Sequence, residues 1–599
     1  MSSVPYKSKL DRAQKWMPGI LAVRTYNREW LFKDIVAGVV LCALLVPQGM
    51  AYAELAGLPP ITGLYTTVVC LFAYAIFGPS PFLVLGPDSS LGPMIAAAIL
   101  PLAMGDEAYA VALAGMLALF VGLICVGAGV ARLGFVSDLL SMPVRVGYLA
   151  GLAVTIFVGQ LPKLLGISID AETFLQEIQA IFSGFSNANL YAFGIGSLCL
   201  IIILGLKKWR STWPGILIAV ISAILITVVF DLAGRGVSTV GVLPQGFPKP
   251  DFPSVKLADM PILAATALGI SLVAIGDTIS VSAGFAARKG YEINSDQEMV
   301  GIGSANLLSG LFTGFPVSTS SSRTAVAEQS GAKTQLTGVL AGTLVLSMLL
   351  FVPSMVKDLP QPALAAIVIT AAIGLFDLQA LRRLFKMRKS EFILAIICAL
   401  GVIMVGVLEG IVIAVIVSIL QFFERSWRPY TAVLGKPSSI EGYHDITRHP
   451  NATLIDGLIM LRWDAPLFFA NANIFRKIVR DKVAQAEEKP YWVLVAAEPV
   501  TDVDTTAAEM LVDLDEELND SGIHLAFAEL KDPVKDKMIQ YGLLETIESY
   551  HFFPTLETAV TAFFEEKRRN EAEKVAALAE DKAETKDKEP SEKTISDAS

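Results

Sequence analysis

The stretch LGPDSSLGPM occupies residues 85–94, and a related stretch, GFPVSTSSSRT, occupies residues 314–324. Each interrupts a series of long apolar runs with a proline and small hydroxyl residues, and then continues as a helical pattern. Broken helices among continuous apolar ones are typical of membrane proteins whose half-helices begin inside the bilayer. The two stretches therefore predict a multi-span α-helical membrane protein built around two half-helices.

The composition agrees with this fold class. Of the 599 residues, 53% are hydrophobic and 17% are charged, whereas soluble proteins carry about 25% charged residues. Apolar runs of about 20 residues, the length that spans a bilayer, follow one another from Phe32 to Phe423. After Arg425 the composition becomes that of a soluble α/β domain. The formal charge of -10 says more about solubility than about what enters a buried site.

Composition and pattern divide the chain into four expected parts. These are a cytoplasmic N-terminal segment (1–33), a transmembrane domain (34–425), a cytoplasmic α/β domain (436–566) and a disordered charged tail (567–599). The N-terminal segment is polar and basic and lacks the apolar core of a cleaved signal peptide. The tail has few large apolar residues, so we expect disorder, or a frayed helix at most.

About 14 membrane segments are expected, beginning near residues 34, 61, 82, 108, 138, 188, 212, 260, 298, 320, 335, 362, 390 and 406. Basic clusters lie at the N-terminus, at 207–210, 288–289 and 382–389, and after the last segment. All of them follow an even number of crossings, so the positive-inside rule places both termini in the cytoplasm.

The two broken segments are the third and the tenth, seven apart. An odd offset places corresponding segments in opposite orientations, as in the inverted repeats of many secondary transporters. Half-helix N-termini facing a central cavity offer free N–H groups and positive dipole ends, which favour an anion. The Ser and Thr residues at these starts suit both capping and ligand binding. They could instead be packing seams, because small residues crowd helix contacts in membranes.

Arg323 and Asp277 are charges at membrane depth, and Asp88 is a third at similar depth. Such a charge costs at least about 2.5 kcal/mol on insertion scales, so each is a candidate for function. Asp277 and Arg323 could form a structural ion pair. Alternatively, Arg323 binds the anion or contributes to the electrostatic field around it, and Asp277 binds a coupling cation, either Na⁺ or H⁺.

Further motifs resemble a known family. The stretch VPQGMAYA at residues 46–53 precedes LAGLPP at 55–60 and GLY at 63–65. This pattern is similar to the signature of the SulP (sulfate permease) anion transporters, and the resemblance continues through Gly86-Pro87 and Ser322-Arg323. It implies a seven-plus-seven inverted repeat, a core that moves against a gate in an elevator-like cycle, and a homodimer.

The resemblance also implies a site. The substrate-binding residues would be Gln48, Tyr52, Asp88, Ser89, Ser90, Ser321, Ser322 and Arg323. Asp277, with Thr319 and Ser321, would bind the coupling ion. Asp88 departs from the animal members, which have an apolar residue there. A carboxylate beside an anion repels it unless protonated or paired, which favours proton coupling; equally, Asp88 could cap its own half-helix.

The α/β domain resembles a STAS domain. Expected strands are 454–461, 491–497 and 523–527, and expected amphipathic helices are 474–487 and 507–519. Thr505 and Thr506 match the position that is phosphorylated in stand-alone bacterial regulators. We favour the alternative that one of them caps the following helix.

The function expected from these features is secondary active transport of a small anion across the cell membrane. Sulfate, bicarbonate and dicarboxylates all fit. No enzymatic activity, metal, nucleic-acid partner or cofactor is expected; Na⁺ remains a candidate coupling ion. Two alternatives stay open: an anion-binding sensor that signals through the STAS domain, and an uncoupled anion channel.

Overall fold

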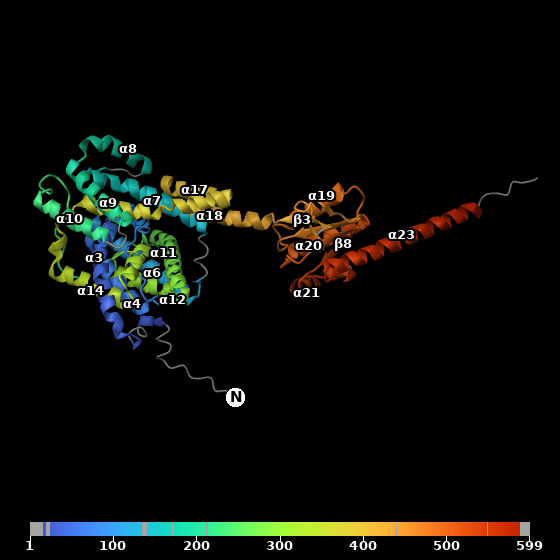
Figure 1. Cartoon of the computed structure of the whole chain (residues 1–599), viewed down its shortest axis with the longest axis horizontal. Helices are drawn as coiled ribbons and strands as arrows, with labels where there is room; N and C mark the ends of the chain where they lie inside the picture. Colours follow the sequence, from blue (N-terminus) through green and yellow to red (C-terminus); the bar gives the residue numbers. More distant parts are fainter. Residues whose placement is uncertain are drawn as a thin grey trace, which may run out of the picture. The chain divides into compact units, whose positions relative to one another are not determined.

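The computed structural model describes residues 16–19, 24–134, 141–169, 173–209, 214–438, 440–547 and 549–587. The chain forms two compact units, Met1–Ser418 and Ile419–Ser599, which are described separately (Figure 1). The boundary falls slightly before residue 425, the expected end of the transport domain. Most of the N-terminal segment, Arg210 of the basic cluster at 207–210 and the end of the tail lie outside the described residues.

A helix lies at each of the 14 expected membrane segments. The continuous ones are α3 (Leu31–Leu55), α4 (Pro60–Phe77), α6 (Glu107–Val130), α7 (Met142–Leu165), α9 (Leu190–Trp209), α10 (Gly215–Val229), α11 (Met260–Lys289), α12 (Ser295–Leu311), α14 (Leu336–Phe351), α15 (Gln361–Leu375), α17 (Lys389–Met404) and α18 (Val407–Trp427). The broken ones are β1 (Leu85–Gly86) with α5 (Gly92–Ala103), and β2 (Ser318–Thr319) with α13 (Ser321–Gln329). Within the described residues, seven helical stretches are long and apolar enough to span a bilayer unaided, and one of them, Gln361–Met387, extends beyond α15. Gly92–Ala103, Gly215–Val229 and Leu336–Phe351 are shorter apolar helices.

Two short α-helices of the first unit were not predicted: α8 (Phe174–Gly184) and α16 (Leu378–Met387). Both mix polar and apolar residues and are too short to produce an apolar run of bilayer-spanning length. The length of apolar runs therefore does not predict them. A capping box fixes the start of α8: Gln176 N–H donates to the Thr173 hydroxyl, and Thr173 N–H donates to the Gln176 side chain.

The helices of the first unit form two bundles (Figure 1). We call α3–α6 with α11–α14 the core bundle, and α7, α9, α10 and α15–α17 the gate bundle. Small residues allow close packing within the core bundle. A Cβ atom on Gly122 of α6 would lie 2.8 Å from the carbonyl oxygen of Gly303 of α12, and the reciprocal distance is 2.9 Å. Glycine at both positions lets these two backbones touch, as is common in membranes.

A buried carboxylate joins the first helix to the loop after the second half-helix. Asp34, at the start of α3, accepts hydrogen bonds from the backbone N–H groups of Lys333 (2.7 Å) and Thr334 (3.2 Å). It also accepts from the hydroxyls of Thr334 (2.8 Å), Thr337 (3.0 Å) and Tyr26 (3.1 Å). Because these donors surround a fully buried charge, they hold the C-terminal end of α13 in place.

The second unit has the α/β architecture expected from its alternating pattern. Its strands are β3 (Thr431–Pro437), β4 (His444–Asp445), β5 (Ala452–Thr453), β6 (Leu458–Trp463), β7 (Trp492–Ala496), β8 (His524–Ala528) and β9 (Phe552–Phe553). They pair in the order β4-β3-β6-β7-β8-β9, with β5 on β3. The pairs from β6 to β9 are parallel, and those of β3 are antiparallel.

Helices cover both faces of this sheet. They are α19 (Ala472–Gln485), α20 (Thr505–Asp520), α21 (Asp532–Gln540), α22 (Leu543–Thr546) and α23 (Leu556–Asp587). One apolar core includes Phe475, Leu511 and Leu514 of α19 and α20, and another includes Val560 and Phe563 of α23. Alternate residues of the buried strands enter opposite cores, which explains why the strands read as continuous apolar runs.

The structure differs from the prediction for the tail. Helix α23 continues from the second unit as far as Asp587, whereas we expected disorder or a frayed helix from residue 567. Ala, Glu, Lys and Arg dominate this stretch, and these residues have high helix propensity even without an apolar face to bury. Residues 588–599 lie outside the described part of the chain.

Candidate functional site

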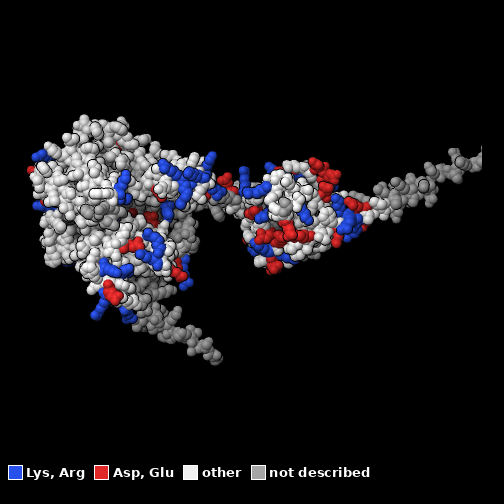
Figure 2. Space-filling view, in the orientation of Figure 1, with Lys and Arg blue, Asp and Glu red and all other residues white. Residues whose placement is uncertain are grey.

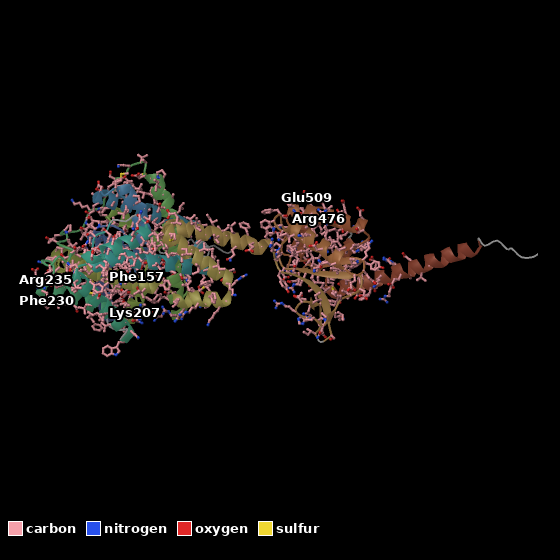
Figure 3. All side chains as sticks on the ribbon, turned by 90° about the horizontal axis from the view of Figure 1, so that it is seen from above. Phe157, Lys207, Phe230, Arg235, Arg476 and Glu509 are labelled. Atoms are coloured by element: carbon pink, nitrogen blue, oxygen red, sulfur yellow. The ribbon has the colours of Figure 1, made fainter. Side chains whose placement is uncertain are left out.

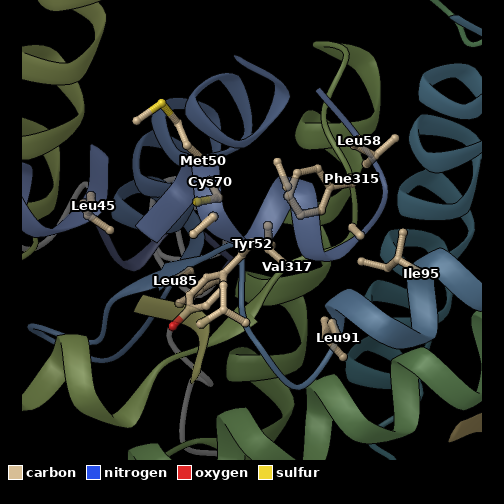
Figure 4. Packing of buried hydrophobic residues seen from close by; sticks show 14 of the residues in the cluster. Leu45, Met50, Tyr52, Leu58, Cys70, Leu85, Leu91, Ile95, Phe315 and Val317 are labelled. Atoms are coloured by element: carbon tan, nitrogen blue, oxygen red, sulfur yellow. The ribbon is translucent and has the colours of Figure 1, made fainter. Parts of the chain in front are cut away.

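The two half-helices meet through their preceding strands. β1 and β2 pair antiparallel, with Leu85 opposite Thr319 and Gly86 opposite Ser318. Figure 4 shows Leu85 and Val317 of these extended segments beside Tyr52 of α3. The segment before β2 is tied down by Asn306 of α12, whose side chain accepts from Val317 N–H (2.9 Å) and donates to the Val317 carbonyl (3.2 Å). This anchoring fixes where α13 begins.

A cavity of about 530 Å³ lies where the half-helices begin. Its walls include all but one of the predicted site residues: Gln48, Tyr52, Asp88, Ser89, Ser90, Asp277, Thr319, Ser321 and Ser322. Segments separated by more than 200 residues of sequence thus converge on one space. The interpretation of the hydroxyls as mere packing seams does not account for their lining a cavity.

Arg323 is the exception, because it lies behind the cavity wall. Its side chain is fully buried, and a Cβ atom on Gly86 would lie 2.7 Å from its Nη1 atom. Its Nη2 atom lies 3.5 Å from Asp88 Oδ2, and the guanidinium donates no hydrogen bond among the described residues. The suggested pair of Arg323 with Asp277 is therefore wrong, since Arg323 pairs with Asp88. Arg323 places a positive charge between β1 and α13 without contacting the cavity.

Asp88 organises a turn and does not cap a helix. Its Oδ1 atom accepts from the Ser90 N–H (3.0 Å) and the Ser90 hydroxyl (2.8 Å). The residue at the N-cap of α5 is Leu91, three positions later. The capping alternative for Asp88 is therefore wrong. Helix α13, in contrast, has a capping serine: Ser320 accepts from the Arg323 N–H at 3.5 Å.

Asp277 of α11 contacts both bundles. Its Oδ2 atom accepts from the Ser90 hydroxyl of the core bundle (3.2 Å), and its Oδ1 atom accepts from the Tyr148 hydroxyl of α7 (3.4 Å). One turn away from Tyr148, Arg145 donates to the Ser280 hydroxyl at 2.5 Å. Sequence reasoning missed Arg145 and Tyr148, although a charge near the start of an apolar run could have singled out Arg145.

The remaining wall of the cavity belongs to the gate bundle. It includes Leu149 of α7, Ile203 and Lys207 of α9, Ile216 of α10, and Ile367 and Thr370 of α15. Most of these are apolar and were not predicted, because nothing in their local pattern separates a cavity wall from a lipid-facing side. Lys207, labelled in Figure 3 near the end of α9, is an exposed cation at the cavity.

Charge and hydrogen bonding in the cavity suit an anion together with a cation. The serine and threonine hydroxyls, the first N–H groups of α13 and the charge of Arg323 favour negative charge. Two carboxylates, Asp88 and Asp277, oppose it. Gln48 adds a side-chain oxygen, Oε1, that is buried and accepts no hydrogen bond among the described residues.

In the second unit, the structure corrects the prediction that a threonine caps α20. The N-cap residue is Asp504, which accepts from the Ala507 N–H (2.8 Å) and, with its other oxygen, from the Phe469 N–H (2.8 Å). Thr505 and Thr506 are the exposed first residues of the helix. Nearby, a hydrogen bond to Asp502 raises the pKa of Lys537 above its usual value.

The N-cap can be tested by substitution. We expect Asp504→Ala to weaken the first turn of α20 by about 1 kcal/mol, because two backbone donors lose their acceptor. Hydrogen exchange of peptides covering α20 should then accelerate several-fold. Thr505→Ala and Thr506→Ala are matched controls that should leave exchange unchanged. Equal acceleration in either control would contradict the assignment of the cap.

Helices α19 and α20 are also joined by ion pairs. Arg476, labelled in Figure 3, lies 3.1 Å from Glu517 and 3.6 Å from Asp513, and Arg480 lies 2.6 Å from Glu517. The hydrogen bond from Arg480 lowers the pKa of Glu517 below its usual value. Glu517 therefore stabilises this unit above its unfolded-state pKa, and the contribution is lost as the pH falls through the folded-state pKa.

The chain is similar to known sequences over most of its length. The model of the sulfate permease family matches residues 31–398, and that of the STAS domain matches residues 449–559. A protein of Mycobacterium tuberculosis (strain CDC 1551 / Oshkosh), named a probable sulfate transporter, is 40% identical over 548 residues, covering 92% of this chain and 98% of that protein. The chloroplastic sulfate transporter 4.1 of Arabidopsis thaliana is 33% identical over 579 residues, covering 92% and 84%.

Solved structures share the fold. The murine Solute Carrier 26 family member A9 anion transporter in the inward-facing state has a TM-score of 0.86 at 21% identity, covering 94% of this chain and 95% of that chain. The transmembrane domain of the cyanobacterium bicarbonate transporter BicA has a TM-score of 0.56 at 22% identity, covering 66% and 98%. These likenesses concern the fold alone. The resemblance noted in the motifs at residues 46–65 is confirmed by the family match and the identities: the chain belongs to the sulfate permease family and carries a STAS domain in its C-terminal part.

Proposed function

We propose that this protein is a secondary active transporter of a small anion, driven by H⁺ or Na⁺. The observation that carries the proposal is the cavity at which both half-helices begin, lined by hydroxyls and backed by the buried Arg323. Helix N-termini, hydroxyl donors and a nearby guanidinium together stabilise an anion without a metal or a covalent step.

The position of the cavity between two bundles supports alternating access. At the C-terminal end of α3, Glu54 joins the bundles: its carboxylate lies 3.2 Å from Lys163 Nζ of α7 and accepts from Gln361 of α15 at 2.7 Å. The cavity wall also contains exposed residues such as Lys207 and Gln329. An elevator-like movement of the core bundle would break the Glu54 contacts and move the half-helices relative to the gate bundle.

Coupling would reside at Asp277. Its contact with Tyr148, and the contact of Arg145 with Ser280, both cross from one bundle to the other. Movement of the core bundle would therefore change the surroundings of this carboxylate. A proton or Na⁺ on Asp277 would offset the carboxylate charge that otherwise repels the anion. Thr319 and Ser321 lie in the same cavity and could contribute oxygen ligands to Na⁺.

The identity of the anion is also part of the proposal. The curated relatives are named as sulfate transporters, and one structure of the same fold as a bicarbonate transporter. We infer that sulfate is the first candidate, followed by bicarbonate and dicarboxylates. We further infer a homodimer in the cell membrane with both termini in the cytoplasm, the latter from the positions of the basic clusters.

Uptake into proteoliposomes tests the proposal. Labelled sulfate, bicarbonate and succinate would each be supplied under an inward Na⁺ gradient and, separately, an inward proton gradient. We expect one anion to accumulate under one gradient. Flux that only equilibrates the anion would favour a channel. Anion binding without flux would favour a sensor that signals through the STAS domain.

A further inference from the structure

Helix α16 is a short amphipathic helix whose buried face packs within the gate bundle. Ala380, Leu381 and Leu384 are buried, and the two leucines cluster with Ala150 of α7 and Ala395 of α17. The packing anchors one side of the helix. The other side is exposed, and it carries both apolar and cationic residues.

The exposed apolar and cationic residues form adjacent stripes. At about 100° per residue, Leu378 and Phe385 lie within about 20° of one another on the helix, and Arg382 and Lys386 follow at about 40° and 80° from Leu378. Leu378 is 46% exposed and Phe385 is 54% exposed. Arg382 and Lys386 are exposed as well. Around the helix, the buried face is followed by the exposed apolar stripe and then by the cations. This order is typical of a helix at the boundary between acyl chains and headgroups.

The cations of α16 are not neutralised by the protein. Among the described residues, Arg388 pairs with Glu391 at 3.6 Å, whereas no ion pair or hydrogen bond involves Arg382 or Lys386. From Asp377 to Glu391 there are five cationic residues and two carboxylates. Figure 2 shows Lys and Arg gathered on this side of the first unit, beside the helix labelled α17 in Figure 1.

We propose that α16 is a binding site for an anionic phospholipid, with the headgroup phosphate on Arg382 and Lys386 and an acyl chain against Leu378 and Phe385. A soluble anion would explain the two cations but not the exposed apolar stripe beside them. The positive-inside rule alone likewise requires cations in this loop but no ordered apolar neighbours. An anionic phospholipid would contact both stripes at once, with its phosphate on the cations and an acyl chain on the apolar residues.

The experiment measures binding of phosphatidylglycerol to the purified full-length protein in neutral detergent. Native mass spectrometry counts bound lipids, and thermal unfolding with added phosphatidylglycerol or phosphatidylcholine reports the stabilisation. We expect phosphatidylglycerol to raise the unfolding midpoint and phosphatidylcholine to have little effect. The double variant R382Q/K386Q should bind phosphatidylglycerol roughly 30-fold more weakly, since each surface cation contributes about 1 kcal/mol.

Two matched variants separate the site from general charge effects. R288Q/K289Q removes two cations near a helix end, but both already pair with Glu328, at 3.8 and 2.8 Å, so binding should be retained. L378S/F385S keeps every charge and should also weaken binding. The single variants R382Q and K386Q, each with an intermediate loss, provide the test if the double variant does not fold.

Several outcomes would overturn the proposal. Equal phosphatidylglycerol affinity in the wild type and R382Q/K386Q would show that these two cations do not bind the lipid. An equal loss of phosphatidylglycerol affinity in R288Q/K289Q would show that the effect depends on net charge alone. Stabilisation by glycerol 3-phosphate as large as that by phosphatidylglycerol would indicate a soluble anion site. None of these readouts depends on transport, so failure here would leave the proposed function standing.

Discussion

Replacing Arg323 with methionine is expected to lower the affinity for the transported anion at least about a hundred-fold, equivalent to about 3 kcal/mol, and to abolish measurable uptake. Methionine fills much of the arginine volume but removes the charge behind the half-helices. Without Arg323, the Asp88 carboxylate 3.5 Å away remains unpaired beside the anion. At short range and intermediate dielectric, the exchange of attraction for repulsion amounts to several kcal/mol.

The same substitution also threatens the fold, so the test needs a second variant. Removing one partner of a buried ion pair typically costs about 3–5 kcal/mol, because the other charge is left uncompensated. The double variant D88N/R323M removes both charges and should recover most of the thermal stability while binding the anion weakly. Uptake and thermal unfolding would be measured on the same preparations. Near-wild-type uptake by stable R323M would show that the guanidinium does not serve the anion.

Asp277→Asn is expected to abolish accumulation of the anion under a cation gradient while preserving exchange of labelled for unlabelled anion. Asparagine has the shape of aspartate. Its Oδ1 atom can still accept from one of the two hydroxyls, Ser90 or Tyr148, and its NH₂ group can donate to the oxygen of the other, so the local structure should survive. It cannot take up a proton, and it is a poorer ligand for Na⁺. The cation gradient would then no longer be linked to anion movement.

Glu298→Gln is a matched control for the Asp277 experiment. Glu298 is likewise a buried carboxylate of the core bundle, but it accepts hydrogen bonds from Tyr74 and Ser80 and does not line the cavity. Its substitution should lower thermal stability and leave the cation dependence of uptake intact. Gradient-driven accumulation that persists in D277N, or disappears equally in E298Q, would remove Asp277 from its coupling role.

The extent to which the fold follows from the sequence depends on the range of the interactions. Apolar run length and the Pro, Ser and Thr residues of the two broken stretches act locally, and they predicted the membrane segments and both half-helices. Helices α8 and α16 were not predicted, because short amphipathic helices owe their stability to packing and not to an apolar run. The full length of α23 was not predicted, because the charged composition was interpreted as disorder, or a frayed helix at most, without regard to helix propensity.

The candidate site divides in the same way. Residue chemistry within single segments indicated the serines and Asp277, and the family resemblance implied Gln48 and Tyr52. The structure places all of them around one cavity. Local sequence did not reveal that Arg323 faces Asp88 behind the wall, or that Tyr148 reaches Asp277 across 129 positions of the chain. Nor did it distinguish Asp504 from its threonine neighbours as the cap of α20.

The sequence by itself thus determined the membrane class, the segment order, the two half-helices and the residues that bring charge and hydroxyls to membrane depth. It could do so because hydrophobic length and helix interruption are properties of contiguous residues. Only the tertiary structure decided which side chains face the cavity, which charges pair and which contacts cross between the core and gate bundles. These depend on the rotation and packing of helices that are distant in the chain, and no local period encodes that geometry.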